Sequence, residues 1–202
     1  MTNNFDEKLF IELGVRISPT IFKRNIIVSY TEEAIEAHRK KYNHLDVYHT
    51  IFAYDNKEIR LGKQRGALPF DFDCEENPQV ALDDTIKLVD FFIKEGCPEN
   101  EIRLWFSGFK GFHVQVLFEA LGIEPDENLH AIFKVIASNF KKQLNLTTLD
   151  MRIYEKVRLW RLENSINSKS GLYKIPLYLE EMYLPLEGIK EMAQSQRLNV
   201  TY

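Results

Sequence analysis

The sequence predicts an α+β protein with an antiparallel sheet that carries helices on one of its faces. Three observations predict this fold class. Apolar residues recur at helical spacing in two stretches, 80–93 and 129–140. Two β-prone runs, 102–106 and 112–118, flank a turn with two glycines and indicate a hairpin. A buried strand at 70–73 precedes the first helical stretch, so this order of elements leaves the second face of the sheet open for a site.

The N-terminal part of the chain predicts one helix and one strand. Thr31 is a suitable N-cap, and acids in the first turn and bases at 38–41 suit the dipole of a helix that ends near Tyr42. The β-prone run 45–54 predicts a strand, and a polar turn at 55–57 follows it.

The remaining boundaries come from glycine and proline. Gly96 and Pro98 end the helix over 80–93, and the second helix follows Pro125. We expect one domain over residues 1–202. Its parts are a small N-terminal α/β lobe (1–64), a lobe that shares its core with the first (65–180), and a helical C-terminal tail (181–202).

Composition limits the class of protein. The chain of 202 residues is 45% hydrophobic and 12% aromatic, enough for a sizeable core. The N-terminus lacks the pattern of a signal peptide, and no apolar run reaches the length of a membrane span. Cys74 and Cys97 are too few for a disulfide framework. We therefore expect a cytoplasmic protein with reduced thiols and no membrane partner.

The net charge of −4 hides two segments of opposite sign. The segment 71–101 has ten acids and two bases, whereas the segment 134–174 has nine bases and three acids. Because phosphate binding depends on local basic groups, the overall acidity does not exclude a nucleic-acid partner.

The strand at 70–73 carries the first candidate site. Side chains alternate between faces along a strand, so Phe70 and Phe72 point into the core while Asp71 and Asp73 share the other face. Adjacent carboxylates repel each other, and Mg²⁺ or Mn²⁺ relieves that repulsion in many sites that also hold phosphates. A solvated strand face is the alternative for such a pair taken alone.

The hairpin turn carries the second candidate site. Its glycines expose backbone N–H groups that a phosphate can approach, and Lys110 adds positive charge. His113 lies in the returning strand on the face opposite Phe112, where it can donate to a phosphate oxygen. An ordinary hairpin with a surface lysine is the alternative.

The third candidate site lies in the basic segment. Asp150 is the only acid between Glu127 and Glu155, and it can complete a metal site. Arg158 and Arg161 are spaced to converge on one polyphosphate, for which the planar guanidinium is well suited. A basic surface without catalysis is the alternative. We expect Trp105 and Trp160 to pack in the core rather than to stack on bases.

Together these segments resemble the archaeo-eukaryotic primase superfamily, which includes the primase-polymerases, and within it they resemble bacterial members of mobile elements or CRISPR loci. The resemblance covers residues 65–176 and begins with Arg65 and Gly66. The residues that match the three motifs are Phe70, Asp71, Phe72 and Asp73 in the first, Ser107, Gly108, Lys110, Gly111 and His113 in the second, and Leu149, Asp150, Tyr154, Arg158, Arg161, Ser165 and Lys169 in the third.

The resemblance implies an RRM-like sheet and a template-dependent nucleotidyltransferase, that is, a DNA primase, a DNA polymerase or both. Asp71, Asp73 and Asp150 would be catalytic and would hold two Mn²⁺ or Mg²⁺ ions. The implied nucleotide-binding residues are Arg65, Ser107, Lys110, His113, Arg158, Arg161, Ser165 and Lys169. The implied partners are NTP or dNTP and a single-stranded or primed DNA template, with an accessory priming domain or CRISPR or replication proteins as further candidates.

The sequence departs from the family pattern at Phe109, where a small residue is common, and it contains no zinc-binding or helical priming module. Two other classes of protein remain open. The segment 110–116 is similar to an RNA-binding motif of RRM domains, although an RRM carries aromatic residues where Asp71 and Asp73 are expected. A metal-dependent nuclease would also use the carboxylates but has less use for a triphosphate site.

Overall fold

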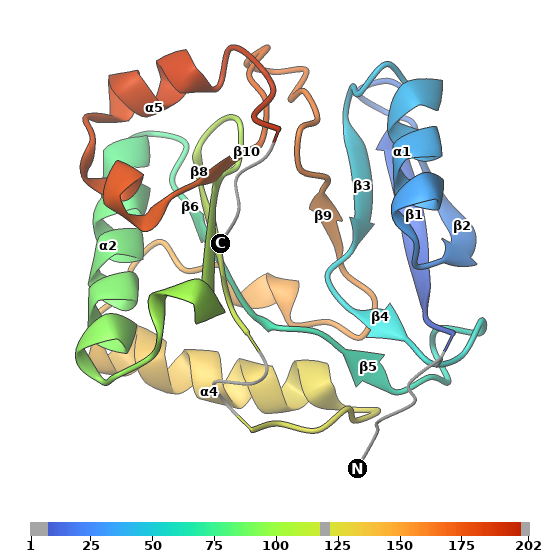
Figure 1. Ribbon diagram of the computed structural model, residues 1–202, viewed down its shortest axis with the longest axis horizontal. Helices are drawn as coiled ribbons and strands as arrows, with labels where there is room; N and C mark the ends of the chain where they lie inside the picture. Colours follow the sequence, from blue (N-terminus) through green and yellow to red (C-terminus); the bar gives the residue numbers. More distant parts are fainter. Residues whose placement is uncertain (1–7, 118–121, 199–202) are drawn as a thin grey trace.

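The computed structural model describes residues 8–117 and 122–198 and contains two antiparallel sheets (Figure 1). The first sheet has the strand order β5-β4-β1-β3-β9, and β2 pairs with β1. Its strands are β1 (Phe10–Arg16), β2 (Phe22–Ser29), β3 (Val47–Thr50), β4 (Ala53–Tyr54), β5 (Gln64–Arg65) and β9 (Leu159–Arg161). The first sheet thus combines the N-terminal strands with β9 from the C-terminal half of the chain.

Helix α1 (Glu32–Lys41) packs on the first sheet. The predicted cap is confirmed, because the side chain of Thr31 accepts a hydrogen bond from the Ala34 N–H. Ile35 is buried in a cluster with Leu13 and Val47, which lie on two of the paired strands. The cluster fixes the helix against the sheet.

The single strand predicted over 45–54 is wrong in one respect, because it is divided into β3 and β4. Ile51 and Phe52 lie between the two pieces as a bend. Their side chains are buried in the core of the second sheet, together with Tyr54. Burial of the Ile51 and Phe52 side chains in this core explains why the strand is interrupted at these residues.

The second sheet has the strand order β10-β7-β8-β6. Its strands are β6 (Leu68–Asp73), β7 (Ile102–Phe106), β8 (Gly111–Val116) and β10 (Ile175–Leu177). Among the described residues, three helices complete this half of the molecule: α2 (Pro78–Lys94), α4 (Leu129–Gln143) and α5 (Leu186–Met192). The predicted α+β class, with antiparallel pairing around the hairpin β7–β8, is confirmed. The predicted end of that hairpin at Phe118 lies outside the described residues.

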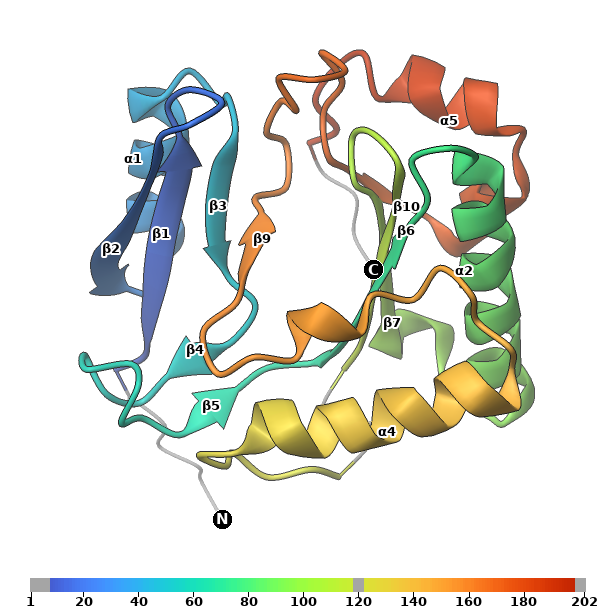
Figure 2. The same ribbon diagram turned by 180° about the vertical axis from the view of Figure 1, so that it is seen from behind.

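The predicted alternation along β6 is confirmed as well. Phe70 and Phe72 are fully buried and belong to the same cluster as Leu88 of α2 and Phe133 of α4. Figures 1 and 2 show α2 to one side of the second sheet and the first sheet to the other, with α4 along the bottom of the view. Residues at odd positions of β6, including Asp71, therefore lie on the face opposite these helices.

A buried carboxylate positions the chain after α4. Asp84 of α2 is 1% exposed, and its Oδ2 accepts hydrogen bonds from the N–H of Thr148 at 2.9 Å and from the hydroxyls of Thr147 and Thr148. These hydrogen bonds position Leu149 beside Phe72, with which it forms an antiparallel β-bridge. Three short 3₁₀ helices complete the fold: η1 (Glu99–Glu101), η2 (Met151–Ile153) and η3 (Leu179–Tyr183).

The segment 154–156, between η2 and β9, is hydrogen-bonded to both sheets. Tyr54 of β4 donates to the Lys156 carbonyl at 2.6 Å, and Tyr154 donates to the Pro69 carbonyl at 2.6 Å. Trp160 of β9 belongs to the same core cluster as Phe70 and Phe72. Within residues 8–117 and 122–198, no helix is long and apolar enough to cross a membrane.

Because β6 and β8 approach each other closely at Gly111, we expect a side chain at this position to lower the stability of the protein. A Cβ atom at this position would overlap the Phe72 carbonyl oxygen, whereas one at Gly188 of α5 would meet nothing within 4 Å. We expect Gly111→Ala to lower the free energy of unfolding by about 3 kcal/mol, because backbone atoms cannot move aside cheaply. Gly188→Ala should raise it by about 0.5–1 kcal/mol. Urea denaturation checks both values, and equal effects would contradict this packing.

Candidate functional site

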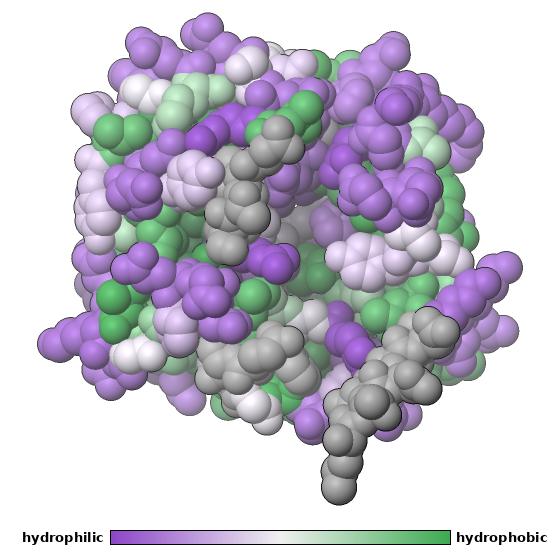
Figure 3. Space-filling model, in the orientation of Figure 1, coloured by the Kyte–Doolittle hydropathy of each residue, from purple (hydrophilic) through white to green (hydrophobic). Residues whose placement is uncertain are grey.

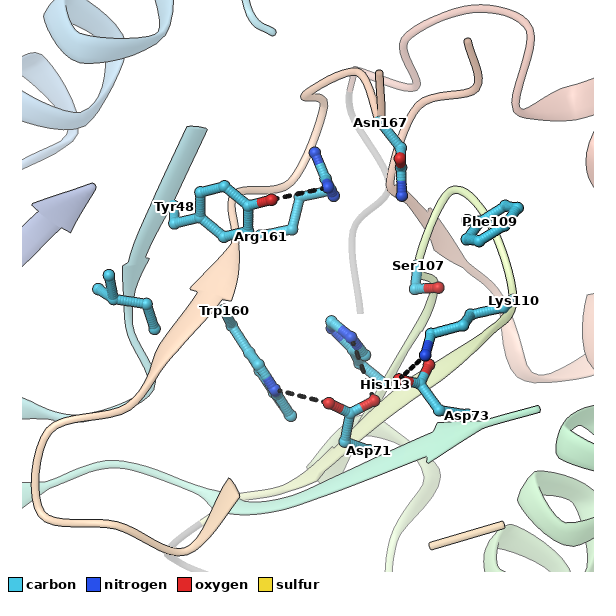
Figure 4. A pocket seen from close by; sticks show the side chains of 11 residues that line it. Tyr48, Asp71, Asp73, Ser107, Phe109, Lys110, His113, Trp160, Arg161 and Asn167 are labelled. Carbon is cyan, nitrogen blue, oxygen red and sulfur yellow. Dashed lines mark hydrogen bonds and ion pairs between the residues drawn. The ribbon is translucent and has the colours of Figure 1, made fainter. Parts of the chain in front are cut away.

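A cavity of about 170 Å³ lies between the two sheets (Figure 4). We call it the central cavity. Its lining comes from β3, β6, the β7–β8 turn, β8, β9 and the segment after β9. The lining residues are Tyr48, Asp71, Asp73, Ser107, Phe109, Lys110, His113, Leu159, Trp160, Arg161 and Asn167. The cavity therefore brings together residues of all three sequence motifs.

Two residues of the central cavity lining, Asp71 and His113, belong to a row of paired strand residues. Asp71 of β6 lies opposite His113 of β8, which lies opposite Trp105 of β7. Trp160 covers this row from the first sheet. Its ring stacks on His113, with the ring centroids 4.3 Å apart and the planes 14° apart, and its Nε1 donates to Asp71 Oδ2 at 3.3 Å. The predicted open face is thus covered at this point.

Burial makes Asp71 an unusual acid. Its side chain is nearly enclosed, and burial raises its pKa to about 8, with further raising by the negative charges of Asp73 and Asp150. Its Oδ1 lies 3.5 Å from His113 Nε2 and has no hydrogen-bond partner among the described residues. The three carboxylates repel one another as the sequence analysis expected.

His113 is held as a neutral imidazole. Burial lowers its pKa well below the ordinary value, and the positive charges of Lys174 and Arg161 lower it further. Its Nδ1 has no hydrogen-bond partner within the described part of the chain. A neutral ring with one unpaired nitrogen can donate or accept one hydrogen bond toward a ligand.

The other two carboxylates are each paired with a cation. Lys110 Nζ lies 3.1 Å from Asp73 Oδ2, which explains part of the rise in the pKa of Lys110. Arg152 donates to Asp150 from Nε at 2.9 Å and from Nη2 at 3.0 Å. Although burial acts to raise the pKa of Asp150, these hydrogen bonds lower it overall. Lys110 and Arg152 are both accessible to solvent.

Asp150 lies beside Asp71 rather than in the central cavity. Its backbone N–H donates to the Asp71 carbonyl at 2.8 Å. Its side chain lines a neighbouring cavity of about 610 Å³, which we call the acidic cavity. The acidic cavity is lined by Asp73, Cys74, Glu75, Glu76, Val80, Lys110, Thr147, Thr148, Leu149, Asp150 and Arg152. Asp73 and Lys110 line both cavities and connect them.

The carboxylates fit the chemistry of a divalent cation without forming a finished site. The unpartnered Oδ1 of Asp71 and the mutual repulsion with Asp73 and Asp150 are what such an ion would relieve. Among the described residues, however, no group of three His, Cys, Asp or Glu side chains is arranged to hold a metal ion. Lys110 and Arg152 already pair with Asp73 and Asp150, so a metal ion would have to compete with these two side chains for the carboxylates.

The glycine turn lies at the mouth of the central cavity. The Ser107 N–H donates to the Gly111 carbonyl at 2.9 Å, and Gly108 has φ of 87°, which favours glycine. Ser107 and Lys110 line the cavity as predicted. Phe109, the departure from the family pattern, also lines it, and its ring lies 5.4 Å from Lys169 Nζ.

Arg161 is held rigidly in the cavity wall. Its Nη1 donates to Asp46 Oδ1 at 2.7 Å and to the Ile166 carbonyl, and its Nη2 donates to the Tyr48 hydroxyl at 2.9 Å. Asp46 is buried and has φ of 45°, a left-handed conformation that costs free energy for a residue other than glycine. The arginine is therefore fixed before any ligand binds.

Four predicted nucleotide-binding residues line neither the central nor the acidic cavity. Arg65 lies in β5, paired with Ala53. Ser165 is buried, and its hydroxyl donates to the Leu162 carbonyl at 2.6 Å. Arg158 and Lys169 are at least one-third exposed and lie 3.9 Å and 3.7 Å from Glu155 and Glu75.

Two residues that were not predicted as site residues shape the site. Trp160 packs in the core as expected, and it also covers Asp71 and lines the central cavity. Lys174 is buried and lies between two indoles, with its Nζ 5.0 Å from the Trp105 ring centroid and 5.3 Å from that of Trp160. Burial lowers its pKa to about 7. Nothing in the local sequence distinguishes this lysine from a surface one.

The bases of the segment 134–174 do not form one surface. Lys134 and Lys141 lie on α4, on the far side of the second sheet, whereas Arg161 and Lys174 lie between the two sheets. The fold therefore separates basic residues that belong to one segment of the sequence.

Comparison with known proteins found no family model that matches the chain and no curated protein that is similar to it.

The raised pKa of Asp71 predicts a pH-dependent stability. Between pH 4 and pH 8 the folded chain keeps a proton that an ordinary aspartate has released in the unfolded chain, so this residue makes stability fall as pH rises. Asp71→Asn removes the effect. Without divalent ions, we expect the stability advantage of Asp71→Asn over wild type to grow from pH 4 to pH 8, by at most about 1.4 kcal/mol per pH unit.

Chemical denaturation at several pH values measures this difference. Glu95→Gln, at an exposed acid directly after α2, serves as the control and should follow the wild-type profile. Parallel profiles for wild type and Asp71→Asn would contradict the raised pKa.

Proposed function

We propose that the protein is a metal-dependent nucleotidyltransferase of the primase-polymerase type. It would extend a 3′-hydroxyl on a DNA template with nucleotides from NTP or dNTP and release pyrophosphate. The observation that carries the proposal is the convergence of three separate sequence motifs. Asp71 and Asp73, the turn with Lys110, and Arg161 line one cavity, and Asp150 is hydrogen-bonded to the backbone of Asp71.

The strand order supports an RRM-like second sheet. The chain runs from β6 through α2 to β7, turns into β8, and continues through α4 to the bridge at Leu149. In space, β8 lies between β6 and β7, and Leu149 lies beside β6 on its other edge. This order fits the split β-α-β arrangement of the ferredoxin-like folds. β10 adds a strand beyond β7.

Asp71, Asp73 and Asp150 would hold Mn²⁺ or Mg²⁺. Two such ions, when bound, lower the pKa of the attacking hydroxyl and neutralise the leaving phosphates. Lys110, which pairs with Asp73 in the structure, would then be free to turn toward a phosphate oxygen. Trp160 would keep water from Asp71, since its indole covers the carboxylate.

The fixed cations and donors around the central cavity would position the triphosphate. Arg161 is held by Asp46 and Tyr48, so little conformational entropy is lost when it binds an anion. Neutral His113 offers one ring nitrogen, and the turn at 107–111 offers backbone N–H groups. Positioning and charge stabilisation of this kind are the main requirements of nucleotidyl transfer.

Primer extension tests the proposal directly. With Mn²⁺, labelled dNTP and a primed template, we expect incorporation by the wild type and losses of more than about a hundredfold for Asp71→Asn, Asp73→Asn and Asp150→Asn. Asp83→Asn, an exposed acid on α2, is the matched control and should retain activity. Template binding without incorporation would indicate an RRM-like binding module, and template degradation would indicate a nuclease.

A second prediction concerns the triphosphate. Lys110→Gln should weaken Mn²⁺-dependent dNTP binding by about ten- to a hundredfold, because a charge-assisted hydrogen bond to phosphate is lost. Affinity for the single-stranded template should change much less. Separate titrations of nucleotide and template measure both, with Lys94→Gln at the exposed end of α2 as control. A larger loss for template than for nucleotide would assign Lys110 to the strand instead.

A further inference from the structure

A third cavity, of about 420 Å³, lies between α1 and the second sheet and shares Trp160 with the central cavity. We call it the basic cavity. Figure 3 shows the surface hollowed between the part that contains α1 and the part that contains β7 and β10. Its lining residues are Tyr30, Glu32, Ile35, Arg39, His49, Arg103, Trp105, Gln115, Trp160, Leu162, Glu163, Asn164, Lys174, Arg197 and Leu198. None of the predicted site residues is among them.

The cavity extends the face of the second sheet that carries Asp71. Arg103 and Trp105 flank the buried Leu104 in β7, so both point to the face opposite the helices. Gln115 lies opposite Arg103 on β8, two pairs along from the row that contains His113 and therefore on the same face of the sheet. The sheet therefore presents the carboxylates at one end of this face and Arg103 at the other.

The three cavities differ in charge. The lining of the acidic cavity has four carboxylates and two cations, and that of the central cavity has two of each. The basic cavity has four cations, Arg39, Arg103, Lys174 and Arg197, against two carboxylates, Glu32 and Glu163. The charge of the cavity linings thus changes from negative to positive along the face, while Glu36 and Glu181, which lie outside the lining, balance part of the positive charge of Arg39 and Arg197.

Arg39 and Arg197 form ion pairs that orient their guanidinium groups but do not use all of the N–H donors of those groups. Arg39 pairs with Glu32 and Glu36 through Nη1 alone, at 3.0 Å each, and Arg197 pairs with Glu181 through Nη1 at 2.6 Å. The Nε of Arg39 is buried and has no hydrogen-bond partner among the described residues. A buried donor without an acceptor costs free energy, and a bound phosphate oxygen would remove that cost.

Aromatic surface accompanies the positive charge. Tyr30, at the entrance to α1, is 50% exposed, and Trp105 and Trp160 form the inner wall with the ammonium of Lys174 between them. Tyr30 is the accessible ring of the three, since Trp105 and Trp160 are buried. Guanidinium groups beside an accessible aromatic ring are the combination with which proteins bind single strands, through phosphate contacts and base stacking. A protein or lipid partner would not require this combination.

We propose that the basic cavity binds one nucleotide unit of a single-stranded nucleic acid, with its phosphate at Arg39 and Arg103 and its base against Tyr30. Since Trp160 lines both cavities, the basic cavity borders the central one, and a strand bound in the first would lie next to the second. The statement that this strand is the template rests on the proposed function. The binding itself requires only the basic cavity.

Fluorescence anisotropy with a dye-labelled oligodeoxythymidylate of about 12 nucleotides tests this site. The assay contains EDTA and no dNTP, so metal-dependent nucleotide binding in the central cavity does not contribute. We expect Arg103→Glu and Tyr30→Ala each to weaken binding about tenfold, and Arg103→Glu to lower the slope of log affinity against log salt by about 0.7 for the lost phosphate contact.

The matched control is Lys142→Glu, which makes the same charge change at an exposed residue of α4, on the far side of the second sheet. It should bind as the wild type does, apart from a small uniform effect of net charge. Equal losses for Arg103→Glu and Lys142→Glu, with Tyr30→Ala unchanged, would overturn the site. Photocrosslinking of an iodouracil-containing strand that reaches no residue of the cavity lining would overturn it as well.

Two further outcomes are distinguishable. Thymidine monophosphate that binds as tightly as the oligonucleotide, with the same sensitivity to Arg103→Glu, would identify a free nucleotide as the occupant and overturn the strand. Arg103-dependent strand binding in a protein that incorporates no nucleotide would overturn the proposed function and leave the site standing. Nucleotide incorporation by a protein whose strand binding does not depend on Arg103 would overturn this site and leave the proposed function standing.

Discussion

The contact on which the site depends is the stacking of Trp160 on His113, with the indole N–H directed to Asp71. Trp160 belongs to β9 in the first sheet, whereas Asp71 and His113 are paired across β6 and β8 in the second. This contact therefore joins the two sheets at the same point at which it removes a carboxylate and an imidazole from water. The raised pKa of Asp71 and the lowered pKa of His113 both follow from that burial.

Such an arrangement destabilises the free protein. Asp71 has an unpartnered oxygen and two like-charged neighbours, and Lys174 is a buried ammonium without a carboxylate within ion-pair distance among the described residues. Groups of this kind persist where function requires them. Each would be relieved by a different part of one ligand assembly, a cation at the carboxylates and phosphates at the basic groups. The opposite signs of the acidic and basic cavities fit this division.

Much of the fold could be predicted from local patterns. The alternation of Phe70 and Phe72 with Asp71 fixed the faces of β6, and the two glycines marked the β7–β8 turn. The site could be predicted only in part, because its completion depends on contacts distant in sequence. Asp150 lies beside Asp71 because Asp84 binds Thr148, and Arg161 is fixed by Asp46 in a left-handed conformation. Burial of Lys174 between two indoles likewise arises only when β7, β9 and the segment before β10 meet.

Binding of Mn²⁺, followed by the loss of the electron paramagnetic resonance signal of the free ion, tests the central claim that these carboxylates form a metal-dependent nucleotide site. A non-hydrolysable dNTP analogue should increase Mn²⁺ binding by the wild type, because the phosphates and Asp71 then share the ion. The same analogue should produce no increase beyond its own affinity for Mn²⁺ in Asp71→Asn. Equal Mn²⁺ binding by the two proteins in the presence of the analogue would contradict the account.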